Sequence, residues 1–294
     1  MTRPAIPAPR ESGNTSTTEL PLYWAAYGPK GVSPLLVLHG GPGASHEYLL
    51  PQMLELAEQR ELILYDQRGG GRSRHPGEGT ITWQTQVRDL AAVVSEFSLE
   101  PPSIVGYSWG GLLAMLYAIE AAAARVPIAP KRMILIDPAP VTRGLREEFE
   151  DEFTRRQQGG EIQTMRERLA ASGLQEMDRD AYRQRAFELS VAGYFADPAR
   201  ASELTPFRVI GKVQKSIWES LGDYDLRPAL GTVKCPALVV HGSHDPIPLE
   251  SSREAAGALG ARFLLIEGSG HVPYIEQPDQ LFSALADFLD DSDD

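Results

Sequence analysis

Residues 106–110 read G-Y-S-W-G, a serine pentapeptide set between an apolar run and a helical pattern. The preceding residues 102–105 (P-S-I-V) are typical of a short buried strand, and residues 111–118 keep apolar side chains at helical spacing. A serine on a sharp strand-to-helix turn projects its hydroxyl, and flanking glycines allow close packing around it. The stretch therefore predicts an accessible nucleophile, Ser108, at the carboxyl end of a strand.

Short apolar runs alternate with helical patterns over much of the chain, which is typical of a mostly parallel sheet covered by helices. The strand candidates are residues 35–38, 62–65, 104–105, 133–136, 237–240 and 263–266. Their continuous hydrophobicity indicates burial on both faces. An antiparallel strand is expected at residues 22–27. The fold class is therefore α/β, a central sheet with helices on both faces.

The alternation stops after residue 138 and returns after residue 235. Between them lie segments with helical spacing, such as 178–196, whose Phe187, Val191, Tyr194 and Phe195 offer one apolar face. We expect a helical cap at residues 141–225, inserted into a core made of residues 19–140 and 226–294. Residues 1–18 are rich in Pro, Ser and Thr and lack an apolar h-region, so we expect a flexible leader and no signal peptide.

Composition excludes several classes of function. The net charge of −12 disfavours nucleic acid or an anionic membrane as the main partner. The single cysteine, Cys235, rules out an intrachain disulfide and a multi-cysteine metal site. The longest apolar stretch is too short to span a bilayer. These observations favour a cytoplasmic protein that acts on a small molecule or small peptide.

A serine hydroxyl needs a base to take its proton and a third group to orient that base. In a doubly wound sheet such partners follow later strands, at the same sheet edge. Asp245 follows the strand at 237–240, and His271 follows the strand at 263–266. The order Ser108, Asp245, His271 is the one used by α/β-hydrolases. These residues are therefore the predicted catalytic triad.

The sequence H-G-G-P-G at residues 39–43 directly follows the strand at 35–38. Acyl transfer requires two fixed N–H donors for the oxyanion of the tetrahedral intermediate. The N–H of Gly41 and the N–H of Trp109 are the expected donors. Gly40, His46 and Tyr107 are expected to border the substrate.

The chain resembles the proline iminopeptidase family (peptidase family S33) of the α/β-hydrolase superfamily. The resemblance extends from about residue 20 to 289 and depends on H-G-G-P-G at 39–43, D-Q-R-G-G-G-R-S at 66–73, G-Y-S-W-G at 106–110 and G-S-G-H at 268–271. It implies an acyl-enzyme mechanism with Ser108 as nucleophile, His271 as base and Asp245 as its orienting acid. It implies no metal and no organic cofactor.

The sequence departs from this family where the substrate amine is bound. A glutamate commonly follows the triad aspartate, but here the residue is Pro246. A second glutamate is expected eleven residues before Asp225, and that position is Gln214, which we expect to contact the substrate in its place. Glu203, Glu219 or Glu188 are the candidate replacements.

Three other functions stay open. A carboxylesterase or a cofactor-free perhydrolase would use the same triad without an amine anchor. A non-catalytic receptor would keep the pocket for ligand binding.

Residues 66–73 lack the lysine and spacing of a phosphate loop, so we expect no nucleotide there. The group of His241, His244 and Asp245 is not expected to bind a metal, since the triad uses Asp245.

Overall fold

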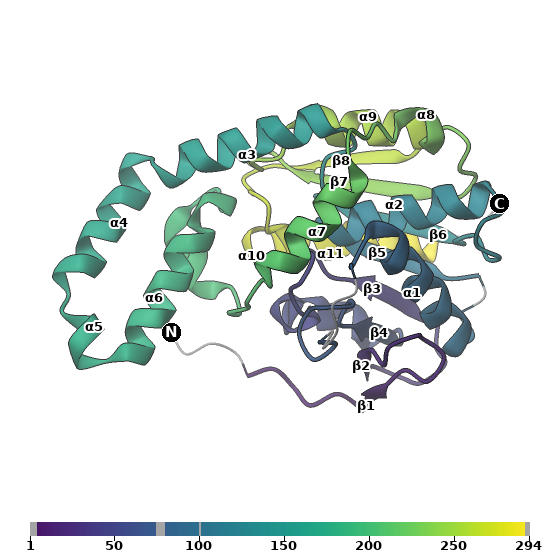
Figure 1. Cartoon of the computed structure of the whole chain (residues 1–294), viewed down its shortest axis with the longest axis horizontal. Helices are drawn as coiled ribbons and strands as arrows, with labels where there is room; N and C mark the ends of the chain where they lie inside the picture. The colour runs from purple at the N-terminus through teal and green to yellow at the C-terminus, as the bar shows by residue number, and fades with distance from the viewer. Residues whose placement is uncertain (1–4, 75–79, 100, 292–294) are drawn as a thin grey trace.

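An eight-stranded sheet forms the centre of the protein (Figure 1). The computed structural model describes residues 5–74, 80–99 and 101–291. The strands are β1 (Glu11–Asn14), β2 (Tyr23–Tyr27), β3 (Leu35–Leu38), β4 (Leu62–Tyr65), β5 (Ser103–Tyr107), β6 (Arg132–Ile136), β7 (Ala237–Gly242) and β8 (Arg262–Ile266). Their order is β1-β2-β4-β3-β5-β6-β7-β8. Pairing is antiparallel for β1 with β2 and for β2 with β4, and parallel from β4 to β8, which confirms the predicted fold class.

The helices follow the strands and fill the segment between β6 and β7. They are α1 (Trp83–Glu96), α2 (Trp109–Ala122), α3 (Arg143–Gln157), α4 (Gly160–Ala171), α5 (Leu174–Met177), α6 (Arg179–Val191), α7 (Gly211–Leu221), α8 (Arg227–Leu230), α9 (Leu249–Leu259), α10 (Pro273–Glu276) and α11 (Pro278–Asp290). Short 3₁₀ helices are η1 (His46–Leu49), η2 (Gln52–Glu58), η3 (Ala192–Tyr194) and η4 (Pro198–Glu203). No helix in the described ranges has the length and apolar character needed to cross a membrane.

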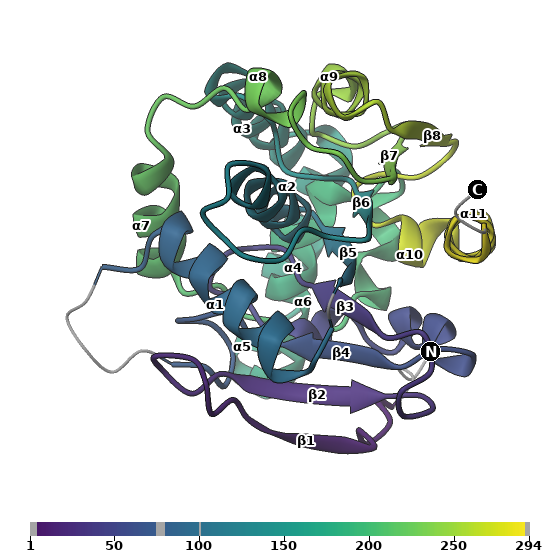
Figure 2. The ribbon, with the colours of Figure 1, turned by 90° about the vertical axis from the view of Figure 1, so that its right-hand side faces the viewer.

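Both faces of the sheet are buried along β3 to β7, as the continuous apolar runs predict. Along β3, Leu36 and Leu38 enter one core, whereas Leu35 and Val37 enter the other. Helices α1, α2, α8 and α9 cover the first core, and η2, α10 and α11 cover the second (Figure 2). Because successive strand residues point to opposite faces, only a run without polar residues satisfies both layers.

The N-terminal segment differs from the expected flexible leader over residues 1–18. Residues 11–14 form β1, which pairs with β2 at the sheet edge. The carboxylate of Glu96 then accepts the N–H groups of Ser16 at 2.8 Å and Thr17 at 2.9 Å. Main-chain hydrogen bonds, not buried side chains, hold this mostly exposed edge strand. Its sequence therefore lacks the apolar pattern that would predict a strand. Residues 1–4 of the expected leader lie outside the described residues.

Residues 141–225, called here the insert, leave the sheet after β6 and return before β7. A bridge between Thr142 and Asp225 joins the two ends of the insert. The N–H of Arg143 donates to Tyr224 O at 2.9 Å, and the N–H of Leu226 donates to Val141 O at 2.9 Å. Helices α4, α5 and α6 extend away from the sheet (Figure 1). The division into a core and a cap with these boundaries stays a prediction.

Candidate active site

Ser108 occupies a sharp turn between β5 and α2, with φ 54° and ψ −119°. Its N–H donates to Ile136 O at 2.9 Å, and its carbonyl accepts the N–H of Ala139 at 2.9 Å. A Cβ on Gly110 would lie 2.1 Å from Leu38 O, so only glycine allows α2 to start this close to β3. Such backbone conformations persist where the surrounding structure enforces them, and here they present the hydroxyl of Ser108.

His271 and Asp245 complete a hydrogen-bonded chain with this serine. The hydroxyl of Ser108 lies 3.0 Å from Nε2 of His271. Nδ1 of His271 lies 2.8 Å from Oδ2 of Asp245. Oδ1 of Asp245 accepts the N–H of Ile247 at 2.8 Å, which fixes the carboxylate. With neutral His271, Nδ1–H donates to Asp245 and Nε2 is free to accept the serine proton.

Burial sets the protonation states of His271 and Asp245. Burial lowers the pKa of His271 to about 4, because imidazolium is poorly solvated there. Burial raises the pKa of Asp245 to about 7, although the neighbouring Asp137 and the N–H of Ile247 act in the opposite direction. The imidazole is therefore a proton acceptor near neutral pH, as a general base must be.

Gly41 and Trp109 line the same cavity as Ser108. Within the described part of the chain, neither of their N–H groups has a hydrogen-bond partner. Gln67 links the two loops that carry them. It donates from Nε2 to His39 O at 2.8 Å and accepts the indole N–H of Trp109 at 2.9 Å.

A cavity of about 800 Å³ opens above the serine, between the strand ends and the insert. Its lower wall includes Gly41, Tyr107 and His271. The residues of the insert that line it include Phe149, Phe153, Tyr194, Leu204, Phe207, Val209 and Trp218. A space of this size with apolar walls and a few fixed polar groups is typical of a small-molecule site.

Comparisons with known proteins agree with this geometry. The sequence model described as "Alpha/beta hydrolase family" matches residues 35–284. The chain belongs to the alpha/beta hydrolase family. It is similar to a proline iminopeptidase of Heyndrickxia coagulans, with 29% identity over 278 residues, 88% of this chain and 91% of the relative.

Solved structures with the same fold include a proline iminopeptidase of Mycobacterium smegmatis, with a TM-score of 0.69, 23% identity and coverage of 95% of this chain and 97% of that one. An alpha/beta fold family hydrolase from Bacillus anthracis gives a TM-score of 0.69 at 19% identity, covering 95% of this chain and 99% of that one. The family and the relatives identify this protein as a hydrolase of the serine class.

Three of the residues expected at the substrate line the cavity of this hydrolase: Tyr107, Gln214 and Glu219. The other three expected residues, Gly40, His46 and Glu203, are absent from its described lining. Gly40 lies beneath the site, where its N–H donates to the hydroxyl of Tyr48 at 2.7 Å.

His46 and Glu203 have partners elsewhere, which explains why neither reaches the cavity. His46 is buried, and its Nδ1 lies 2.7 Å from Oδ1 of Asp66, so it fixes the loop that begins at that residue. Glu203 pairs with Arg200 on η4. Glu188, the remaining candidate for the amine, is buried against Arg185.

The acidic side chains that line the cavity are each paired with a cation. Glu147 pairs with Arg143 at 2.9 Å, and Glu150 pairs with Arg146 at 2.5 Å. Glu219 lies 3.6 Å from Lys215. Among the described residues that line the cavity, no carboxylate is left without a cation.

The insert also contacts the base directly, which the sequence did not reveal. The N–H of His271 donates to Tyr194 O at 2.7 Å, and the Tyr194 ring stacks on the imidazole at 5.1 Å between centroids. Oε1 of Glu276 accepts the N–H of Ala196 at 3.0 Å, and its Oε2 accepts the N–H of Gly270 at 2.6 Å. One carboxylate therefore joins the insert to the loop that carries the base.

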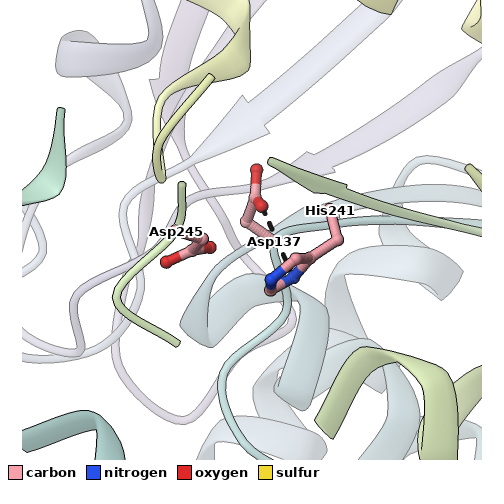
Figure 3. A group of neighbouring side chains, drawn as sticks. All are labelled: Asp137, His241 and Asp245. Carbon is pink, nitrogen blue, oxygen red and sulfur yellow. Dashed lines mark ion pairs between the residues drawn. The ribbon is translucent and has the colours of Figure 1, made fainter. Parts of the chain in front are cut away.

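A second residue that sequence reasoning missed is Asp137, directly after β6. One ligand atom each from Asp137, His241 and Asp245 lie within 4.8 Å of one another, and all three residues are buried (Figure 3). The metal-like group considered from the sequence instead contained His244, whose Nδ1 lies 3.0 Å from the hydroxyl of Ser243 at the exposed end of the loop. The only sequence feature that points to Asp137 is that its carboxylate follows a buried strand directly.

Proposed function

We propose that this protein is a serine hydrolase that works through an acyl-enzyme and releases N-terminal residues from small peptides or arylamides, in the manner of a proline iminopeptidase. The observation that carries the proposal is the hydrogen-bonded triad of Ser108, His271 and Asp245 at a cavity of about 800 Å³. The two contacts of the triad are 3.0 and 2.8 Å long. No other described group at this cavity combines a nucleophile, a base and an orienting carboxylate.

In the proposed reaction, Oγ of Ser108 attacks the substrate carbonyl while Nε2 of His271 takes the hydroxyl proton. The N–H groups of Gly41 and Trp109 stabilise the oxyanion, each worth roughly 10²-fold or more in rate. The protonated His271 then gives its proton to the leaving amine or alcohol. Water, activated by His271, hydrolyses the acyl-enzyme and restores Ser108.

The preference for a peptide or arylamide rests on the similarity to proline iminopeptidases along most of the chain. The aromatic wall of the cavity, formed in part by Phe149, Phe207 and Trp218, supports a compact apolar acyl group such as prolyl. In this reading, the free amine of the substrate displaces an arginine or lysine from Glu147, Glu150 or Glu219.

A carboxylesterase is the second candidate, and the paired carboxylates favour it. An ester without a free amine leaves the pairs of Glu147 with Arg143 and of Glu150 with Arg146 intact. The residues Pro246 and Gln214 also stand where a proline iminopeptidase has carboxylates. The same triad would serve an ester equally well, since an ester carbonyl is more electrophilic than an amide carbonyl and an alkoxide departs more easily than an unprotonated amide anion.

Covalent labelling tests the catalytic role. We expect a fluorophosphonate to label Ser108 in the folded protein, and S108A to remain unlabelled while keeping its free energy of unfolding. We also expect S108A to lose about 10⁴-fold or more in kcat. Folded wild-type protein that stays unlabelled would refute the hydrolase and favour a receptor.

Three chromogenic substrates separate the two enzyme candidates: prolyl p-nitroanilide, N-acetylprolyl p-nitroanilide and p-nitrophenyl acetate. A peptidase that binds the amine cleaves the first at least about tenfold faster than the second, because acetylation removes the charge that a carboxylate recognises. Turnover of p-nitrophenyl acetate alone would overturn the peptidase and support the esterase.

A further inference from the structure

Asp137 is a buried carboxyl group with an incomplete set of hydrogen bonds. It is 0% exposed, and its Oδ1 accepts the N–H of Gly242 at 2.7 Å. Its Oδ2 is buried with no hydrogen-bond donor directed to it from the described residues. An ionised carboxylate in this position would leave one oxygen without a partner, at a cost comparable to that of an unpaired buried charge.

Among the described residues, no cationic side chain donates a hydrogen bond to Asp137 to offset such an ionised carboxylate. His241 Nδ1 lies 3.7 Å from Oδ1 of Asp137, beyond hydrogen-bond range, and 2.9 Å from the hydroxyl of Ser252 (Figure 3). Burial lowers the pKa of His241 to about 4, so this imidazole is neutral. The guanidinium of Arg156 is directed to the main-chain carbonyls of His244 and Asp245.

The neighbour of Asp137 is Asp245, the carboxylate that orients His271. The two come from loops that follow the adjacent strands β6 and β7, and a carboxylate oxygen of one lies within 4.8 Å of a carboxylate oxygen of the other. Two neighbouring carboxyl groups in a buried site do not both ionise, so one proton is shared between them. Asp245 has two donors, Ile247 N–H and His271 Nδ1, whereas Asp137 has one. The proton therefore belongs on Asp137.

We propose that Asp137 is a positioning residue: as a neutral carboxylic acid it donates its proton to Asp245 and holds that carboxylate ionised and directed at His271. The proposal rests on the proposed hydrolase function of Ser108. Burial and the charge of Asp245 raise the pKa of Asp137 well above its usual range, in keeping with a neutral acid.

The remaining titratable groups around the pair agree with this arrangement. His271 and Arg156 face it from the base loop and from α3, while Tyr107 and Tyr274 contribute hydroxyls from β5 and α10. Burial raises the pKa of Tyr107 and of Tyr274 above the usual range, so both stay neutral. The pair thus carries one negative charge in total, and that charge faces the base.

Two substitutions test the proton on Asp137 without straining the backbone. Asp137 has φ 42°, a conformation that asparagine and glycine adopt more easily than other residues. Asp137→Asn keeps a neutral donor toward Asp245, and Asp137→Gly removes the donor. S252A is the matched control, because it alters the partner of His241 on the other side of the group and leaves both carboxyls in place.

The readout is the pH dependence of the rate at which a fluorophosphonate labels Ser108, since it needs no knowledge of the substrate. The labelling rate falls at low pH as His271 becomes protonated, and we call this part of the profile the acid limb. We expect D137G to shift the midpoint of the acid limb upward by about one to two pH units, because Asp245 loses a hydrogen bond to its charged form. D137N and S252A should keep the wild-type limb. Thermal unfolding of each variant verifies that it is folded.

The outcomes separate the proposal from its alternatives. If Asp137 were ionised, both D137N and D137G would remove a negative charge beside the base, and the limb would shift downward in both. That result, or an unchanged limb in D137G, overturns the proposal. A wild-type protein that is not labelled at any pH refutes the proposed function itself, so the two failures are distinguishable.

Discussion

The carbonyl of Tyr194 accepts the N–H of His271 at 2.7 Å, and the ring of Tyr194 stacks on the imidazole. The residue that supports the base thus comes from the insert, about eighty positions earlier in the chain. Aromatic contacts of this kind contribute about 0.5–1.5 kcal/mol.

Replacing Tyr194 tests this support. We expect Y194A to lower kcat for p-nitrophenyl acetate about 2- to 10-fold, because the imidazole loses the ring that restricts its rotation. The main-chain hydrogen bond stays in the variant. Y194F keeps the ring and should retain the wild-type kcat; an equal loss in Y194F would contradict a role for stacking.

Gly40 lies beneath the nucleophile with no room for a side chain. A Cβ there would lie 2.7 Å from Cβ of Ser108 and 2.8 Å from the hydroxyl of Tyr48. We expect G40A to displace Ser108 and to lower its labelling rate by about 10²-fold, as small misplacements of reacting atoms do.

A glycine in open space gives the matched control for G40A. A Cβ on Gly144, in α3, has nothing within 4 Å. G144A should therefore keep the wild-type labelling rate and raise the free energy of unfolding by about 0.5–1 kcal/mol. Normal labelling of G40A would show that the turn tolerates the methyl group.

Glu276 joins the insert to the base loop, and an amide in its place cannot do so. Its carboxylate accepts N–H groups from Ala196, Asp197 and Gly270. In E276Q the amide nitrogen would face an N–H group, so we expect the free energy of unfolding in urea to fall by about 1–3 kcal/mol. E267Q, at an exposed position of the same loop, should change it by less than about 0.5 kcal/mol. Equal effects of the two substitutions would argue against the bridging role.

His39 gives a pH dependence of known sign. Its Nδ1 lies 2.8 Å from Gly40 O, its Nε2 accepts the N–H of Gln67 at 3.1 Å, and burial lowers its pKa from 6.5 to about 4. Between these two values the unfolded chain binds a proton that the folded chain does not, so stability falls as pH falls. The expected slope is about 1.4 kcal/mol per pH unit.

H39Q isolates this effect, because glutamine does not titrate. Urea unfolding of the wild type and of H39Q at pH 7 and pH 5 should give a smaller loss of stability in the variant. Parallel changes in the two proteins would mean that His39 is not held neutral by the fold.

Much of the core was predictable from the sequence, because buried parallel strands require apolar side chains on both faces. The order of Ser108, Asp245 and His271 along these strands indicated where the site lies. The position of the site could be predicted because each triad residue directly follows a strand, and the carboxyl ends of parallel strands meet at one edge of the sheet.

Contacts that depend on the docking of the insert were not predictable. Helical periodicity indicates which face of 178–196 is apolar, but it does not indicate that Tyr194 meets His271. The expected role of His46 followed from its nearness to H-G-G-P-G in sequence, whereas its side chain turns toward Asp66. Asp137 was not predictable either, because the sequence does not show which partner a single carboxylate after a strand has.

The bridge made by Glu276 has a consequence for protein engineering. Chimeras of this family would exchange the insert to change which substrates are accepted. Here residues 196 and 197 of the insert share one carboxylate with Gly270 of the base loop. A transplanted insert that lacks matching N–H groups would leave Oε1 of Glu276 without its donors, so Glu276 would no longer join the insert to the base loop. A graft that retains residues 194–197 would keep the contacts of the insert with Glu276 and with His271.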